Sequence, residues 1–306
     1  MSEQRLLGGV GEISFPPLSF NSWIDDIKTL AEYAVEDPQI CYSAFTKGLC
    51  HRWSFIQRTL PGMSSLFAPL EECLRDILIP AIIGRPVTDI ERTIISLPVR
   101  HGGLGITNPV HTCQREYNAS KAITSDLVDL IYNQKQDLSL FDFQSQLQTI
   151  HDLKANKEIF LKNLLCDTMA NLENPSMKRS LKLSSEKGCG TWLTVLPLQQ
   201  YGYCLNKNEF RDAICLRYGW NIPKMPHFCG CGQRNSVDHT LICKKGGYVA
   251  MQHNHLRDLN AEMQREVCRD IVVEPQLLPL SNEEVEGVQG NRAAPDISSR
   301  GVVEHF

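Results

Sequence analysis

Long hydrophobic runs are missing from this sequence. The longest apolar segment, Ile77–Ile83, is interrupted by Pro80 and falls far short of the roughly 20 residues that a transmembrane helix needs. The first residues, MSEQRLLGGVGEISFPP, contain no apolar core of a secretory signal peptide. These absences predict an intracellular protein without a membrane partner, nuclear or cytoplasmic, whose 12 cysteines are mostly reduced.

A strong excess of either charge is also missing. The formal net charge is −4, which argues against a surface covered with phosphate-binding side chains. The distribution is uneven, however, because residues 201–270 carry 10 Lys/Arg and 7 Asp/Glu whereas residues 271–306 carry 2 and 6. The basic excess in 201–270 is a weak indication of an anionic partner.

Helical patterns dominate residues 1–185, so the predicted fold class is mainly α. The first helix is expected to be capped by Asn21 or Ser22 and to end before Pro38, where the next helix begins. A capping box at Thr88–Glu91 predicts a further short helix. The buried face of the first helix would comprise Trp23, Ile27, Leu30, Ala31 and Ala34.

The segment RHGGLGITNP, residues 100–109, interrupts these helices with three closely spaced glycines. It lacks the Gly-Lys-Ser/Thr ending of a phosphate-binding loop. We therefore interpret it as a structural turn.

Composition changes at residues 184–190, and a linker subdomain is predicted for residues 186–226. Thr191–Pro197 and Tyr201–Leu205 have the pattern of short strands or extended segments, and Glu209–Trp220 that of an amphipathic helix. With the cysteine-rich segment 227–247 and the final segment 248–306, four regions are expected.

A cysteine and histidine cluster follows the spacing C-x-C-x7-H-x3-C. Its members are Cys229, Cys231, His239 and Cys243. Three thiolates and one imidazole are a common ligand set of structural zinc, and they leave no open position for a water. The histidine and the last cysteine are four residues apart and would share a helix face, while Gly230 and Gly232 would permit the positive-φ turn that brings the first two thiols together. We predict one structural zinc ion.

A structural alternative stays open for this cluster: two buried thiols, a loop thiol and an unrelated histidine. Common zinc modules place two or more residues between paired cysteines, and this sequence has one. Isolated cysteines on apolar faces are interpreted as small buried hydrophobic residues. These are Cys41, Cys73, Cys215 and Cys268.

The final segment, 248–306, has an α/β pattern. A helix is expected after Gln252, with an inner face comprising Leu256, Leu259, Met263 and Val267. A strand is predicted at Ile271–Glu274, and Pro295-Asp296 would head another. A helix, a strand and an acid in this order fit the opening of a metal-dependent nuclease core.

Five motifs occur in order: LPVRHGGLGITNP, WLTVLPLQQYGYCLNKNEFRDAICLRYGW, the C-G-C-G…H-T-L-I-C cluster, GGYVAMQHNHLRDL, and EPQLLPL followed by APDIS. Together they make the chain, from about residue 20 onward, resemble the C-terminal part of reverse transcriptases from non-LTR retrotransposons that carry a restriction-like endonuclease. The resemblance implies a thumb and linker at 1–185, a zinc knuckle at the cluster, and a truncated restriction-endonuclease-like segment at 248–306. His253-Asn254 match the family's Arg-His-Asn motif, and Asp296 matches the first metal-binding acid of the nuclease.

The sequence departs from that family at its catalytic motifs. It contains no Tyr/Phe-x-Asp-Asp polymerase motif, and no second nuclease acid in a matching context follows Asp296. Gln252 and Ala294 stand where the family has basic residues. The resemblance therefore implies that Asp296 is vestigial and that Mg²⁺ would bind only in an intact parent nuclease.

We expect a mobile-element polyprotein fragment without catalytic activity that binds DNA or RNA weakly, in a salt-sensitive way, through the zinc knuckle. Two alternatives stay open: a zinc-stabilised helical interaction module, or a product without a selected function. The oligomeric state is not indicated. Expected contacts to nucleic acid are Arg234, Lys244, Lys245, His253, Asn254 and Arg257.

Overall fold

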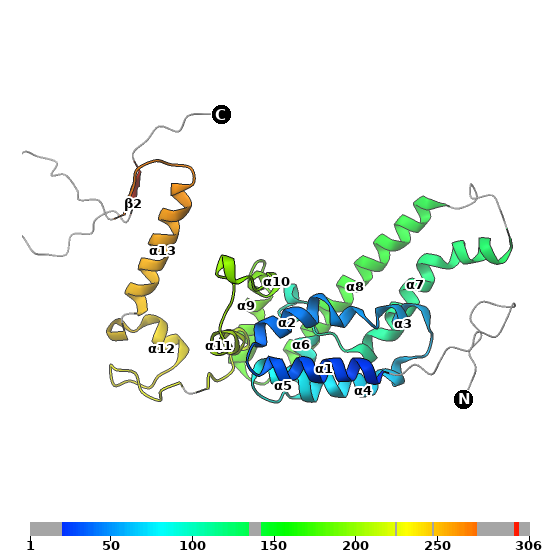
Figure 1. Cartoon of the computed structure of the whole chain (residues 1–306), viewed down its shortest axis with the longest axis horizontal. Coiled ribbons are helices and arrows are strands. Elements are labelled where there is room, and N and C mark those ends of the chain that lie inside the picture. The colour runs from blue at the N-terminus through cyan, green and yellow to red at the C-terminus, as the bar shows by residue number, and fades with distance from the viewer. Residues whose placement is uncertain (1–19, 135–141, 224, 247, 274–296, 300–306) are drawn as a thin grey trace, which may run out of the picture. The chain divides into compact units, whose positions relative to one another are not determined.

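The computed structural model describes residues 20–134, 142–223, 225–246, 248–273 and 297–299 (Figure 1). The chain divides into two compact units, Met1–Pro223 and Lys224–Phe306. Both consist mainly of helices, which confirms the predicted mainly α class. In the described part of the chain, no helix is long and apolar enough to cross a membrane.

The first unit is a helical bundle (Figure 1). The predicted linker subdomain, 186–226, belongs to this unit as far as Pro223. Short 3-10 turns at Leu49–His51, Ser64–Phe67, Val99–His101 and Gln199–Tyr201 connect some of the helices. The helices are α1 (Asn21–Ala34), α2 (Pro38–Lys47), α3 (Ser54–Thr59), α4 (Ala68–Cys73), α5 (Ile79–Ile83), α6 (Asp89–Ser96), α7 (Pro109–Tyr132), α8 (Phe143–Asn171), α9 (Pro175–Ser184), α10 (Thr191–Thr194) and α11 (Lys207–Tyr218).

Helix α1 buries the predicted face but begins differently from the prediction. Ile27, Ala31 and Ala34 are buried, and the other two predicted residues pack against the core. The N-cap is Phe20 without a side-chain cap, so the predicted cap at Asn21 or Ser22 is wrong. The centres of the Phe20 and Phe67 rings lie 5.1 Å apart. This aromatic contact holds Phe20 against the core at the N-cap position, one residue before the predicted cap at Asn21.

Local signals account for two other helix boundaries. The predicted capping box is present: the Glu91 backbone N–H donates to Thr88 Oγ1 at 3.3 Å, and the Thr88 N–H donates to Glu91 Oε2 at 2.9 Å. Between α4 and α5 the chain forms a π-helical turn at Leu74–Leu78. Pro80 lies two residues after this turn, and because proline has no N–H to donate, a local change of helix type is expected there.

One hydrophobic core joins helices from α1 to α11. Its partners lie far apart in sequence: the rings of Tyr42 and Phe210 are 6.0 Å apart, and those of Trp192 and Phe210 are 5.9 Å apart. The largest fully buried side chains are Tyr218, Phe45, Phe67, Phe210, Ile27, Leu70, Leu74, Leu78, Ile79, Ile82, Ile94 and Ile95.

The glycine-rich turn at residues 100–109 fits tightly against this core. Gly102 and Gly105 have φ values of +85° and +71°, which favour glycine. A Cβ at Gly103 would lie 1.9 Å from the Leu97 carbonyl oxygen. These features agree with the interpretation of a structural turn.

Thr191–Pro197 and Tyr201–Leu205 were predicted to be short strands or extended segments, and the strand alternative is wrong. Val195 has extended backbone, and Tyr203–Leu205 lie in no helix or strand. The structure forms α10 and the 3-10 turn Gln199–Tyr201 there. Leu193 is buried, while Leu196 is 51% exposed, so this segment buries a single position rather than one face of a strand. No strand in the described part of the first unit could supply the backbone partners that a strand requires.

The second unit contains α12 (Val237–Ile242), a 3-10 turn (Lys244–Gly246), α13 (Tyr248–Arg265), and the strands β1 (Ile271–Val273) and β2 (Ile297–Ser299). The predicted strand at 271–274 is confirmed as β1 over Ile271–Val273, and Glu274 lies outside the described residues. The two strands pair antiparallel, with Ile271 opposite Ser299. Asp296 lies outside the described residues.

The apolar stripe of α13 is exposed, so its predicted burial is wrong. Exposed fractions are 62% for Leu256, 54% for Leu259 and 62% for Met263. Val267, predicted on the same face, lies beyond the end of α13 at Arg265 and is 81% exposed. Ala261, which lies on another face, is the residue of this helix that is fully buried. A periodic apolar pattern predicts which face can be buried, but burial requires a second element against it.

Candidate metal centre

A tight hairpin carries the first two cysteines of the cluster. Phe228 and Arg234 form an antiparallel bridge. The Cys229 backbone N–H donates to the Gln233 carbonyl at 2.9 Å, and the N–H of Gly232 donates to the Cys229 carbonyl at 2.8 Å. Gly232 has φ +87°, as predicted. Gly230 is not in the left-handed region, so one glycine is enough to reverse the chain.

Helix α12 places the other two cluster residues. The Ser236 hydroxyl caps this helix by accepting from the His239 backbone N–H at 3.0 Å. The Cys243 N–H donates to the His239 carbonyl at 2.9 Å. Because this bond spans one helical turn, His239 and Cys243 lie on the same side of the helix, as predicted from their spacing.

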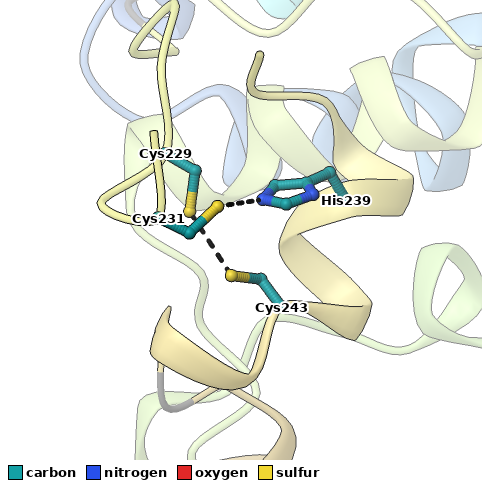
Figure 2. A group of neighbouring side chains, drawn as sticks. All are labelled: Cys229, Cys231, His239 and Cys243. Atoms are coloured by element: carbon teal, nitrogen blue, oxygen red, sulfur yellow. Dashed lines mark hydrogen bonds between the residues drawn. The ribbon is translucent and has the colours of Figure 1, made fainter. Parts of the chain in front are cut away.

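The hairpin and the helix bring all four side chains together (Figure 2). The Sγ atoms of Cys229 and Cys243 are 3.6 Å apart, and Cys231 Sγ lies 3.2 Å from His239 Nε2. The four ligand atoms all lie within 4.8 Å of one another. Ligands around a tetrahedral zinc ion, with bonds of about 2.3 Å to sulfur and 2.0 Å to nitrogen, are separated by about 3.5 to 3.8 Å. The cluster could therefore hold a metal ion with little movement.

The chemistry of the donor set also fits a metal. Cys243 is buried and the other three residues are half-buried. The Cys231 backbone N–H lowers the pKa of Cys229, but the Cys243 thiol, burial and the Cys231 thiol raise it, and the net direction is upward. Crowded thiols resist ionisation without a cation, whereas a bound dication stabilises the thiolates that coordinate it.

Three predicted nucleic-acid contacts lie beside the cluster. Arg234, Lys244 and Lys245 are exposed, and none has an ion-pair partner among the described residues. Phe228, opposite Arg234 in the hairpin, is 69% exposed and was missed by the sequence reasoning. The signal available in the sequence was an aromatic residue directly before the first cysteine of the cluster, where a bound metal would hold its backbone in place.

The remaining predicted contacts lie on α13. His253 and Asn254 are exposed. The Arg257 guanidinium pairs with Asp258 at 2.8 Å, and its side chain is 14% exposed. Arg257 is therefore less accessible to a phosphate than the three cations beside the cluster.

No protein-family model, curated protein or solved structure matches this chain. The resemblance to retrotransposon reverse transcriptases thus stays a prediction, and the function is argued from the site itself.

Proposed function

We propose that the second unit is a zinc-stabilised module that binds nucleic acid, and that the chain is a catalytically inactive fragment of a retroelement reverse transcriptase and endonuclease polyprotein. The observation that carries the zinc-module part of the proposal is the convergence of four soft ligand atoms within 4.8 Å, next to three exposed cations and an exposed aromatic ring. The retroelement part is supported by the sequence resemblance alone.

Zinc is the metal that this donor set favours. Thiolate and imidazole ligands suit zinc, whereas Mg²⁺ and Ca²⁺ require oxygen ligands. Four protein ligands complete the tetrahedron and leave no position for a reacting water, so the ion would be structural. A metal would supply stabilisation that this unit otherwise lacks, because Cys243 and Ala261 are the only buried apolar residues among those described in it.

Nucleic acid is the partner that the surface around the cluster fits. Arg234, Lys244 and Lys245 would each contact a phosphate, and about three contacts give a logarithmic salt slope of roughly −2 to −3. The Phe228 ring would stack on an unpaired base, which favours single strands over duplexes. Few contacts imply weak affinity.

The test is a titration of the full, zinc-loaded chain with labelled single-stranded and duplex DNA, read by fluorescence anisotropy at about 50 and 200 mM salt. We expect single strands to bind more tightly. The double variant Lys244→Gln/Lys245→Gln should reduce the salt slope by roughly 1.5, and Phe228→Ala should weaken single-strand binding by about tenfold.

The matched control is Lys178→Gln/Arg179→Gln, which removes the same charge from exposed positions of α9. This variant should bind like the unmodified chain. Absence of binding at the lower salt concentration, or equal losses in both double variants, would rule out the proposed interface.

A second candidate function is a zinc-stabilised module that binds another protein. It is favoured by the exposed stripe of α13, where Leu256, Leu259 and Met263 are each more than half exposed. The two functions predict different losses: Leu259→Ser would impair a protein interface, whereas Phe228→Ala and the double lysine variant would impair nucleic-acid binding.

The proposal includes the absence of nuclease activity. A single carboxylate, Asp296, binds Mg²⁺ weakly because the ion keeps its waters unless several anionic oxygens replace them. We therefore expect that supercoiled plasmid incubated with the chain and Mg²⁺ or Mn²⁺ is nicked no faster than with Asp296→Ala. Nicking that disappears in this variant would contradict the proposal.

A further inference from the structure

The first unit contains a cavity of about 810 Å³ that the proposed function does not use. It is bounded mainly by α3, α6, the first turns of α7, and α8. Its volume lies in the range of small-molecule sites. The lining residues that matter for its chemistry are Trp53, Arg58, Arg92, His111, Arg115 and Phe160.

Arg115 in this cavity lacks hydrogen-bond acceptors. Its guanidinium carbon lies 4.9 Å from the centre of the Phe160 ring. Its Nε atom is buried and has no hydrogen-bond partner among the described residues. A guanidinium has five N–H donors, and buried donors without a partner are rare in proteins, so an external acceptor is expected.

Two carboxylates in the lining are already engaged. Glu71 accepts two hydrogen bonds from Arg92, both at 2.7 Å, and Glu116 accepts one from Lys157 at 3.0 Å. Both acids thus have a cationic partner other than Arg115, and no hydrogen bond joins either of them to Arg115 among the described residues.

Asp89 and Arg58 also line the cavity and contribute to its charge. Asp89 lies near Arg75, whose pKa is raised mainly by Asp76 and also by Asp89. Arg58 on α3 is exposed and has no ion-pair partner in the described part of the chain. The cavity therefore offers two uncommitted guanidinium groups, Arg58 and Arg115.

The start of α7 adds to this preference for an anion. His111 and Arg115 are one turn apart and lie on the same face of α7. The helix begins at Pro109, so its positive end is at the cavity, although Asn108 caps the N–H groups of Val110 and His111. Phe160 is 47% exposed and, with Trp53, provides an apolar and aromatic wall.

We propose that this cavity binds a phosphate-bearing ligand, with the phosphate held by Arg115 and Arg58 and the body of the ligand against Phe160. Arginine donates paired hydrogen bonds to phosphate oxygens, and the cavity volume exceeds that of phosphate alone. The phosphate could belong to a free nucleotide or to a nucleic-acid strand. The site lies in the first unit, so it does not depend on the zinc cluster.

Calorimetry on the full, zinc-loaded chain tests the proposal with three probes: inorganic pyrophosphate, adenosine monophosphate and a short single-stranded oligonucleotide. The oligonucleotide arm uses the Phe228→Ala/Arg234→Gln/Lys244→Gln/Lys245→Gln chain, which lacks the side chains proposed to bind nucleic acid beside the cluster. We expect saturable binding of at least one probe, weakened by about tenfold or more in Arg115→Gln and in Arg58→Gln. Arg179→Gln, at an exposed position of α9, should leave the affinity unchanged.

The probes separate the two sources of phosphate. Binding of adenosine monophosphate identifies a nucleotide site, whereas binding of the oligonucleotide alone identifies a strand. Arg58 is exposed, so Arg58→Gln keeps the test valid if Arg115→Gln fails to fold. The proposal is overturned if no probe binds, or if the affinity in Arg58→Gln equals that in Arg179→Gln.

Discussion

Gly103 shows how far a single residue can constrain the first unit. A side chain at this position would meet the carbonyl of Leu97, which is backbone and cannot rotate away. The same turn is held by Arg217, which donates to the Val99 carbonyl at 3.1 Å and the Gly103 carbonyl at 3.4 Å. Three glycines in the sequence predicted a turn here. Which glycine is irreplaceable depends on the end of α6, which no local pattern reveals.

Gly103→Ala should destabilise the first unit by several kcal/mol, because overpacking against fixed backbone typically costs about 1–3 kcal/mol or more. The matched control is Gly62→Ala. Gly62 has φ +68° but open space around its Cβ position, so this change should cost only about 1–2 kcal/mol of backbone strain. Urea unfolding of both variants measures the difference. Equal losses of stability would show that the contact with Leu97 is not limiting.

The cysteines should differ sharply in their reactivity. Cys41 is buried, and burial, with a smaller effect of Asp37, raises its pKa to about 11. Because the thiolate is the reactive form, iodoacetamide at pH 8 should modify the exposed Cys166, Cys189 and Cys204 first and leave Cys41 unmodified in the folded chain. Peptide mass spectrometry measures the order. Early modification of Cys41 would contradict its burial.

At the scale of elements, helix ends were predictable where the cap chemistry is explicit, and apolar faces were predictable where a neighbouring helix covers them, as in α1. The capping box at Thr88 and the proline start of α2 are local chemistry, and both appear in the structure. The segment 191–205 has strand-forming residues but no neighbouring strand in the described part of its unit, so it forms two short helical turns joined by irregular backbone. The stripe of α13 has helical periodicity, yet its exposure depends on elements that periodicity cannot reveal.

Arg211 on α11 forms hydrogen bonds to the ends of two other helices, α1 and α5, and no local sequence pattern predicts these contacts. Its guanidinium donates to the Ala34 carbonyl at 3.3 Å, at the end of α1, and to the Ala81 and Ile82 carbonyls at 2.7 and 3.3 Å, at the end of α5. The last carbonyls of a helix lack partners within the helix and carry partial negative charge. One side chain therefore stabilises two helix C-termini.

Arg211→Met should lower the free energy of unfolding of the first unit by about 1.5–3 kcal/mol or more, the typical contribution of hydrogen bonds to a charged group. Arg211→Lys should restore part of this loss, because an ammonium group keeps the charge but not the planar arrangement of donors. Arg179→Met, on the exposed side of α9, is the control and should have little effect. Thermal unfolding followed by circular dichroism tests this. A loss below about 0.5 kcal/mol for Arg211→Met would show that water replaces these bonds.

At the scale of the whole molecule, the two units depend on different forces. The first unit has a continuous core from α1 to α11 and would fold by hydrophobic burial. In the described part of the second unit, the fully buried apolar residues are Cys243 and Ala261, too few for a stable core. The cluster spacing predicted from sequence the four residues that the structure brings together. The proposed dependence of the unit on a metal follows from its small number of buried apolar residues.

Metal removal should therefore affect the units unequally. In the account proposed above, a chelator unfolds the segment 227–247, because binding energy at a structural zinc site is folding energy. Hydrogen exchange should show loss of protection at the Cys229 and Cys243 backbone N–H groups, while α1 and α11 keep theirs. Simultaneous loss in both units would show that the zinc site supports the whole chain.

The central claim, a zinc ion held by the cluster, is tested most directly by the zinc content of the purified chain. Elemental mass spectrometry measures it for the unmodified chain and for the Cys243→Ser variant. The account predicts about one equivalent of zinc in the unmodified chain and a large decrease in the variant, since the loss of one of four ligands opens the site. Less than about half an equivalent, unchanged by Cys243→Ser, would contradict the metal centre and the nucleic-acid-binding module built on it.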